Sequence, residues 1–151
     1  ASAALAAAHL GMEIVIARPD GYELDPEDTA LVRRIAQARG GEFVHIMNDP
    51  DEAVVGADAV YVKSWGAIKY FGQPEAEAEF RAGLRDWRLT AQRLKSTRQG
   101  RATVMHCLPV RRNVEIDDAV LDGPSSAVVD QAENRLHVQR ALLLNLLGEL
   151  R

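Results

Sequence analysis

The sequence has one cysteine, Cys107, so the chain cannot form an internal disulfide, and this fits a reducing compartment such as the cytoplasm. No apolar run reaches the roughly 18 residues that a membrane helix needs, because His9 and Glu13 interrupt the longest candidate. The Ala-rich start at residues 1–8 lacks a basic leading segment, which argues against a signal peptide. We therefore expect a cytoplasmic protein with no membrane partner.

The sequence also lacks an excess of positive charge and the motifs that bind common cofactors. Its formal net charge is −4, which argues against nucleic acid as a partner. It contains no glycine-rich phosphate loop, and its cysteine and histidines do not have the spacing of a metal site. His106 and Cys107 are adjacent, so on a strand they would face opposite sides, a poor arrangement for a nucleophile and its base.

What the sequence does contain is an alternation of helical and strand patterns over 151 residues, 47% of them apolar. The expected strands are residues 13–17, 42–46, 58–62, 102–105 and 127–129. The expected helices are residues 2–10, 26–39, 51–55, 116–121 and 131–147, with two short helices between 73 and 97. This order predicts an α/β fold with a mostly parallel sheet and helices on both faces, a Rossmann-like three-layer α/β/α arrangement.

Polar clusters follow three of these strands. They are Lys63-Ser64-Trp65, His106-Cys107-Leu108-Pro109 and Glu133-Asn134-Arg135. Ligands of such folds bind beyond the carboxyl ends of the strands, so we expect the clusters to converge on one edge.

The segment at 106–113 is the most informative, and the residues alone leave two interpretations open. A strand that ends in a turn with a cis Leu108–Pro109 bond frees carbonyls that can accept from a substrate amide. Arg111 and Arg112 can then grip a carboxylate. The alternative is an ordinary loop with a buried cysteine and two solvated arginines.

Two other cations have similar alternatives. Arg135, in the first turn of the last expected helix, can reach a developing oxyanion or pair with Glu133 on the surface. Lys63 follows a buried strand, where its ammonium group either pairs with an anion or extends into solvent while its aliphatic chain covers the core.

Together these motifs resemble the transcarbamylase family, in particular its ornithine-type branch. His-Cys-Leu-Pro at 106–109 followed by Ala-Glu-Asn-Arg at 132–135 is that family's signature for the second, amino-acid-binding domain, and the resemblance covers essentially the whole chain. In ornithine members, the loop after the third strand reads Asp-x-x-x-Ser-Met-Gly, and its aspartate pairs with the free α-ammonium of ornithine. Here Val60 replaces the aspartate, Lys63 precedes the serine and Trp65 replaces the methionine.

This difference implies an N-acylated substrate, because a free α-ammonium beside Lys63 would be repelled and unpaired. The Lys-Ser-Trp-Gly loop and the Val-Arg-Arg-Asn segment resemble the N-acetylornithine branch. The resemblance implies transfer of a carbamoyl group from carbamoyl phosphate to the δ-amine of N-acetyl-L-ornithine, in arginine biosynthesis and without a cofactor. Ornithine or N-succinylornithine as the substrate, and a non-catalytic amino-acid-binding module, are the alternatives.

The resemblance also implies residue roles. In the catalytic segment that begins at His106, the carbonyls of Cys107 and Leu108 would hold the carbamoyl NH2 group, and Arg135 would steady its oxygen. The substrate-binding residues would be Lys63, Ser64, Trp65, Pro109, Arg111 and Glu115.

Glu115 stands where N-acetylornithine-type relatives carry a lysine that CO2 converts to a carbamate. We predict that Glu115 is a permanent anion in its place, turned towards Lys63, Ser64 and His106. The alternative is an exposed glutamate that begins the helix at 116–121.

The family's first domain supplies a Ser-x-Arg-Thr loop for phosphate and a His-Pro segment, and neither motif occurs in this sequence. We therefore expect residues 1–151 to be the second domain, truncated at its N-terminus and inactive alone. The resemblance implies that the intact enzyme is a homo-oligomer, a trimer with sites at subunit interfaces.

Overall fold

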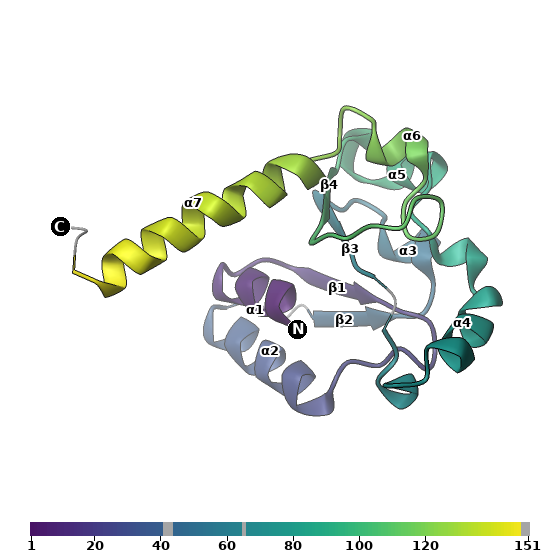
Figure 1. Cartoon of the computed structure of the whole chain (residues 1–151), viewed down its shortest axis with the longest axis horizontal. Coiled ribbons are helices and arrows are strands. Elements are labelled where there is room, and N and C mark those ends of the chain that lie inside the picture. The colour runs from purple at the N-terminus through teal and green to yellow at the C-terminus, as the bar shows by residue number, and fades with distance from the viewer. Residues whose placement is uncertain (41–43, 65, 149–151) are drawn as a thin grey trace. The chain divides into compact units, whose positions relative to one another are not determined.

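The computed structural model describes residues 1–40, 44–64 and 66–148, and the chain divides into two compact units (Figure 1). The first unit comprises Ala1–Val55 and Trp65–Trp87, and the second comprises Gly56–Ser64 and Arg88–Arg151. Each unit has its own pair of parallel strands and its own apolar core.

The first unit is built on β1 (Ile14–Ala17) and β2 (Val44–Met47), which pair in parallel with Ile14 opposite Val44. Helices α1 (Ser2–His9) and α2 (Pro26–Ala38) pack against each other and against this pair. Their shared core consists of Ala8, Ile14, Val32 and Ala36. The remaining elements are α3 (Pro50–Ala53), the 3-10 turn η1 (Ile68–Tyr70), α4 (Pro74–Ala82) and the 3-10 turn η2 (Arg85–Trp87).

Helix α2 begins and ends where its local sequence dictates. The Asp25 side chain accepts a hydrogen bond from the backbone N–H of Glu27 at 2.7 Å, and Pro26 occupies the first turn. After the helix, Gly40 adopts a φ of +78°, a conformation that glycine reaches without steric cost.

The second unit carries the residues of the predicted site. Its strands β3 (Ala59–Val62) and β4 (Thr103–His106) pair in parallel, with Val62 opposite His106. Its helical elements are α5 (Ala91–Ser96), the 3-10 turn η3 (Arg98–Gly100), α6 (Asp118–Leu121) and α7 (Val128–Leu146). Its core consists of Leu89, Val104, Ile116 and Val120.

The predicted α/β class with parallel strands is confirmed. The first four expected strands correspond to β1, β2, β3 and β4, and residues 42–43 of the second lie outside the described residues. In the described ranges the strands form two two-stranded sheets rather than one continuous sheet. The fifth strand, expected at 127–129, is wrong: the chain there enters α7, and only Ser126 forms a parallel bridge to Val104.

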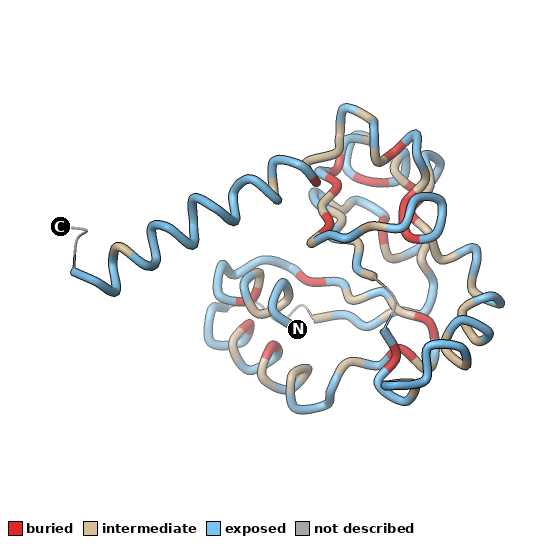
Figure 2. Tube along the Cα trace, viewed as in Figure 1, coloured by how far each residue is buried: buried red, intermediate tan, exposed pale blue. Residues whose placement is uncertain are grey.

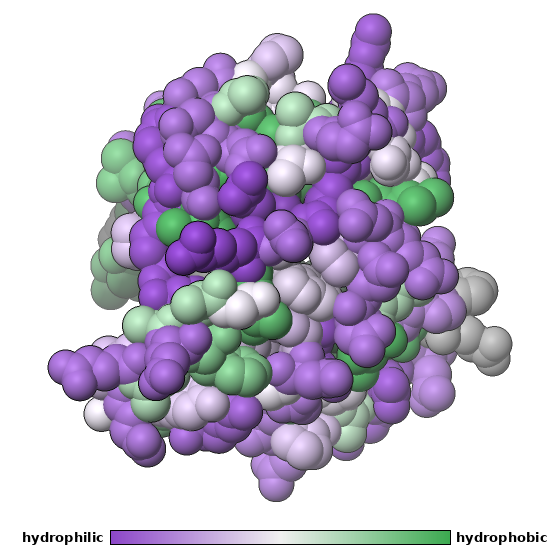
Figure 3. Space-filling view, turned by 90° about the vertical axis from the view of Figure 1, so that its right-hand side faces the viewer, coloured by the Kyte–Doolittle hydropathy of each residue, from purple (hydrophilic) through white to green (hydrophobic). Residues whose placement is uncertain are grey.

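Helix α7 is exposed along nearly its whole length (Figure 2). Val129, Leu136 and Leu143 are 78%, 67% and 60% exposed, and their seven-residue spacing places them on one face of the helix. The face of the molecule in Figure 3 is mostly hydrophilic and carries only scattered apolar side chains. Among the described helices, none is long and apolar enough to cross a membrane.

Candidate functional site

The ends of β3 and β4 bring two of the predicted clusters together. Because the strands are parallel and in register, the residues that follow each strand lie side by side. The Lys63 Nζ donates to the Cys107 Sγ at 3.4 Å, and the Ser64 hydroxyl donates to the carbonyl oxygen of Pro109 at 3.1 Å. Trp65, the third member of the first cluster, lies outside the described residues.

The turn after β4 has an unusual backbone. The Leu108–Pro109 peptide bond is cis, as the sequence suggested, and Leu108 has a φ of +55°. A non-glycine residue in this region costs on the order of 1–3 kcal/mol, and such residues cluster at functional sites. Within the described residues, no group donates to the carbonyl oxygens of Cys107 and Leu108. Both oxygens are therefore able to accept from a ligand.

His106 supports this turn from inside the unit. Its side chain is buried, and its Nδ1 accepts from the backbone N–H of Leu108 at 2.9 Å. The proton of the neutral imidazole therefore lies on Nε2, which has no hydrogen-bond partner among the described residues. Burial lowers the pKa of His106 below its usual value; the Glu115 carboxylate opposes this shift and the Lys63 ammonium reinforces it.

Glu115 is fully buried and pairs with Arg111. Its Oε1 accepts from Nε and Nη2 of Arg111, both at 2.7 Å, and its Oε2 accepts from the Arg111 backbone N–H. The carboxylate lies close enough to His106 to influence its pKa, as expected, but its partner is Arg111 rather than Lys63 or Ser64. The alternative of an exposed glutamate is also wrong, because the turn from 111 to 115 folds the side chain back onto the guanidinium.

Arg112, the second arginine of the motif, is held by α6. It donates to Asp118 at 2.7 Å and to both carboxylate oxygens of Asp122 at 2.7 and 2.8 Å. These hydrogen bonds hold the pKa of both carboxyls below the usual value. The interpretation in which Arg112 grips a ligand carboxylate is therefore corrected, and Arg111 is likewise paired, with Glu115, while its side chain is 43% exposed.

Arg135 lies further inside its helix than expected, because α7 begins at Val128 rather than at Gln131. It is exposed, and we find no hydrogen bond or ion pair between it and any other described residue. Its expected surface partner Glu133 lies 3.6 Å from the Nε2 of His137 instead. The third cluster is therefore not joined to the strand-end residues by any direct contact that the structure describes.

Val60 lies within β3, inside the strand expected at 58–62. Together with Val62 it packs against the apolar core of the second unit, because alternate residues of a strand face the same side. Residue 60 is therefore not part of the polar edge. The residue that presents a charge there is Lys63.

Sequence reasoning missed two residues of the site, Tyr61 and Gln131. The Gln131 Oε1 accepts from the backbone N–H of His106 at 2.9 Å, and its Nε2 donates to the Tyr61 hydroxyl at 3.4 Å. Partial burial raises the pKa of the Tyr61 phenol, and the hydrogen bond from Gln131 opposes this. The alternation of β3 could have identified Tyr61, since it faces away from the core-facing Val60 and Val62.

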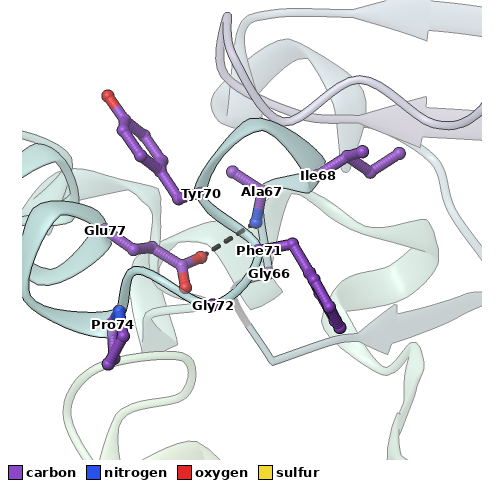
Figure 4. A pocket seen from close by; sticks show the side chains of 8 residues that line it. All are labelled: Gly66, Ala67, Ile68, Tyr70, Phe71, Gly72, Pro74 and Glu77. Carbon is purple, nitrogen blue, oxygen red and sulfur yellow. Dashed lines mark hydrogen bonds between the residues drawn. The ribbon is translucent and has the colours of Figure 1, made fainter.

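An apolar pocket lies in the first unit, in the segment that follows Trp65 (Figure 4). It is lined by Gly66, Ala67, Ile68, Tyr70, Phe71, Gly72, Pro74 and Glu77. The Glu77 carboxylate accepts from the backbone N–H of Ala67 at 2.9 Å and so fixes this loop. None of the predicted site residues that the structure describes lines the pocket. Across the described ranges, no three His, Cys, Asp or Glu side chains are grouped so that they could hold a metal ion.

The chain matches the family model of the aspartate/ornithine carbamoyltransferase Asp/Orn binding domain over residues 1–146. It is 47% identical to an ornithine carbamoyltransferase of Syntrophus aciditrophicus, over 91% of this chain and 43% of the relative. It is 38% identical to an N-acetylornithine carbamoyltransferase of Xanthomonas campestris, over 99% of this chain and 44% of the relative.

Among solved structures, the chain resembles acetylornithine transcarbamylase complexed with acetylcitrulline, with a TM-score of 0.85 and 37% identity. The match covers 94% of this chain and 42% of that one. The chain therefore spans less than half the length of the relatives that it matches.

Proposed function

The chain belongs to the aspartate/ornithine carbamoyltransferase family, and we propose that it is the amino-acid-binding domain of an N-acetylornithine carbamoyltransferase. The reaction would move the carbamoyl group of carbamoyl phosphate to the δ-amine of N-acetyl-L-ornithine, giving N-acetyl-L-citrulline and phosphate in arginine biosynthesis. The part of the relatives that this chain does not span would hold the phosphate. We further propose a homotrimer that works in the cytoplasm.

The observation that carries the substrate assignment is the position of Lys63. Its ammonium lies at the end of β3, 3.4 Å from the Cys107 sulfur. The buried carboxylate of Glu115 is already paired with Arg111. A free α-ammonium at this edge would meet the like charge of Lys63, whereas an N-acylated nitrogen carries no charge.

The proposed chemistry uses the strand-end geometry. The neutral substrate δ-amine attacks the carbamoyl carbon and a tetrahedral intermediate forms. The bond from this carbon to the phosphate oxygen then breaks, and phosphate leaves with the proton that the amine gives up. The free carbonyl oxygens of Cys107 and Leu108 would accept from the carbamoyl NH2 group, and Arg135 would donate to the developing oxyanion. Lys63 and the exposed part of Arg111 would bind the substrate carboxylate, with Ser64, Pro109 and Trp65 around it. The rate enhancement would come from proximity and charge stabilisation.

Ornithine is the second candidate substrate. The observation in its favour is the 47% identity to the Syntrophus aciditrophicus enzyme, which is named an ornithine carbamoyltransferase. Family membership is common to both candidates, so it does not distinguish between them.

The test is steady-state kinetics of the complete protein with carbamoyl phosphate and N-acetyl-L-ornithine, N-succinyl-L-ornithine or L-ornithine. We expect the highest kcat/KM with N-acetyl-L-ornithine. Lys63→Met should raise the kcat/KM for L-ornithine about tenfold relative to that for N-acetyl-L-ornithine, because the like charge is gone. Lys95→Met, on exposed α5, is the control and should leave the ratio unchanged. A preference for L-ornithine in the unmodified protein would refute the assignment.

A further inference from the structure

Along the outer edge of β4, the first hydrogen-bond partners are backbone groups and the last is a side chain. The N–H of Val104 donates to the Ser125 carbonyl and the carbonyl of Val104 accepts from the Ala127 N–H, both at 2.8 Å. The next donor on this edge is the N–H of His106. The chain has by then entered α7, so no neighbouring strand remains, and the Gln131 Oε1 accepts this N–H at 2.9 Å.

The same amide group reaches the other strand of the pair. The Gln131 Nε2 donates to the Tyr61 hydroxyl at 3.4 Å, although the two residues are 70 positions apart in sequence. The sulfur of Cys107 accepts from the Lys63 Nζ at 3.4 Å, and the Cys107 side chain lies near enough to the Tyr61 hydroxyl to help raise the pKa of the phenol. The hydrogen bonds therefore run from the His106 backbone through Gln131 to Tyr61.

We propose that Gln131 and Tyr61 are positioning residues that fix the carbonyl groups of Cys107 and Leu108 for carbamoyl transfer. This inference rests on the proposed function and adds residues that do not touch the substrate. Gln131 anchors the N–H of His106, the residue before Cys107, and Tyr61 holds the Gln131 amide group from β3. A backbone held at this point has less freedom to rotate the Cys107 carbonyl away from the reacting group.

The contacts predict a separation between kcat and KM. Lys63 and Arg111, the proposed carboxylate ligands, make no hydrogen bond to Gln131 or Tyr61 among the described residues. Loosening the anchor should therefore affect the orientation of the carbamoyl group more than the affinity for the amino acid. The loss of one net hydrogen bond corresponds to a roughly fivefold decrease in kcat, with the KM for N-acetyl-L-ornithine changing less than about twofold.

The experiment compares Tyr61→Phe, Gln131→Glu and the double variant in the complete protein. Gln131→Glu keeps an acceptor for the His106 N–H but loses the donor to Tyr61, and Tyr61→Phe loses the same hydrogen bond from its other end. Each single variant should lower kcat about fivefold, and the double variant should be no worse than the singles, since they share one interaction. Tyr70→Phe and Gln139→Glu are the matched controls and should retain wild-type kinetics.

Gln131→Met tests the backbone anchor separately. It should lower kcat further than Gln131→Glu and increase hydrogen exchange in the peptide that contains His106 about tenfold or more, because the N–H loses its acceptor. Multiplicative losses in the double variant, or an unchanged kcat in both single variants, would overturn the proposal. So would unchanged exchange in Gln131→Met. A wild-type protein without carbamoyl transfer to any of the three amino acids would instead refute the proposed function.

Discussion

The buried carboxylate of Glu115 is held by the half-exposed guanidinium of Arg111, whose Nε and Nη2 both donate to the same oxygen at 2.7 Å. Burying a carboxylate is costly unless it is paired and hydrogen-bonded, and here the Arg111 backbone N–H supplies a further hydrogen bond. The pair closes the turn that follows His-Cys-Leu-Pro. It therefore links the stability of that turn to the orientation of Arg111.

Breaking this pair should destabilise the protein. Arg111→Ala should cost about 1–3 kcal/mol, less than a fully buried pair, because its guanidinium is partly exposed. In a double-mutant cycle by urea unfolding, Arg111→Ala and Glu115→Ala should couple by well over the ~0.2–1 kcal/mol of an exposed pair. Lys63→Ala with Glu115→Ala is the matched control and should be nearly additive. A larger coupling for Lys63 would contradict the observed pairing.

His106 should make stability depend on pH. Because burial lowers its pKa, the folded state favours the neutral imidazole. This contribution is present above the unfolded value of about 6.5 and is lost as the pH falls through it towards the lower folded value. The Tm should therefore fall between about pH 7.5 and about pH 5.5. In His106→Asn, which keeps an acceptor for the Leu108 N–H, the fall should be smaller.

Equal slopes in the wild type and in His106→Asn would show that His106 is not the titrating group.

Arg135→Ala should separate catalysis from stability. Its side chain is exposed on α7, so the free energy of unfolding should change by less than about 0.5 kcal/mol. In the complete protein kcat should fall roughly 10²–10³-fold, the effect of losing a donor to a developing oxyanion. Arg140→Ala, also exposed on α7, is the control. A change confined to the KM for N-acetyl-L-ornithine would contradict the role in the transition state.

The apolar face of α7 should cause the 151-residue chain to associate with itself. Val129, Leu136 and Leu143 are all largely exposed on this face. At protein concentrations of about 50 μM, sedimentation velocity should show species larger than the monomer, because uncovered apolar surface favours association. Leu136→Gln combined with Leu143→Gln should shift the distribution towards the monomer, whereas Asn145→Ala should not. A chain that stays monomeric at every concentration would rule this out.

The sequence by itself determined the α/β class, because the alternation of strand and helix patterns depends only on local periodicity. It also predicted that the polar clusters share one edge, and Lys63 and Cys107 of the first two clusters do contact each other there, since they follow neighbouring parallel strands. The prediction of a fifth strand was wrong because it rested on the same local pattern over too few residues. A run as short as 127–129 has too little pattern to distinguish a strand from the first turn of a helix.

The tertiary structure alone decided the side-chain partners. Arg111 and Arg112 are adjacent in the motif, yet they pair with different carboxylates. Arg111 pairs with the buried Glu115, whereas Arg112 pairs with Asp118 in α6 and with Asp122 just after α6. The sequence could not identify Gln131 as a site residue, because its two partners, His106 and Tyr61, are distant from it in the chain. A motif specifies which groups are available. The packing of β3, β4 and α7 specifies which of them come within hydrogen-bond distance, because that distance is set by the folded backbone.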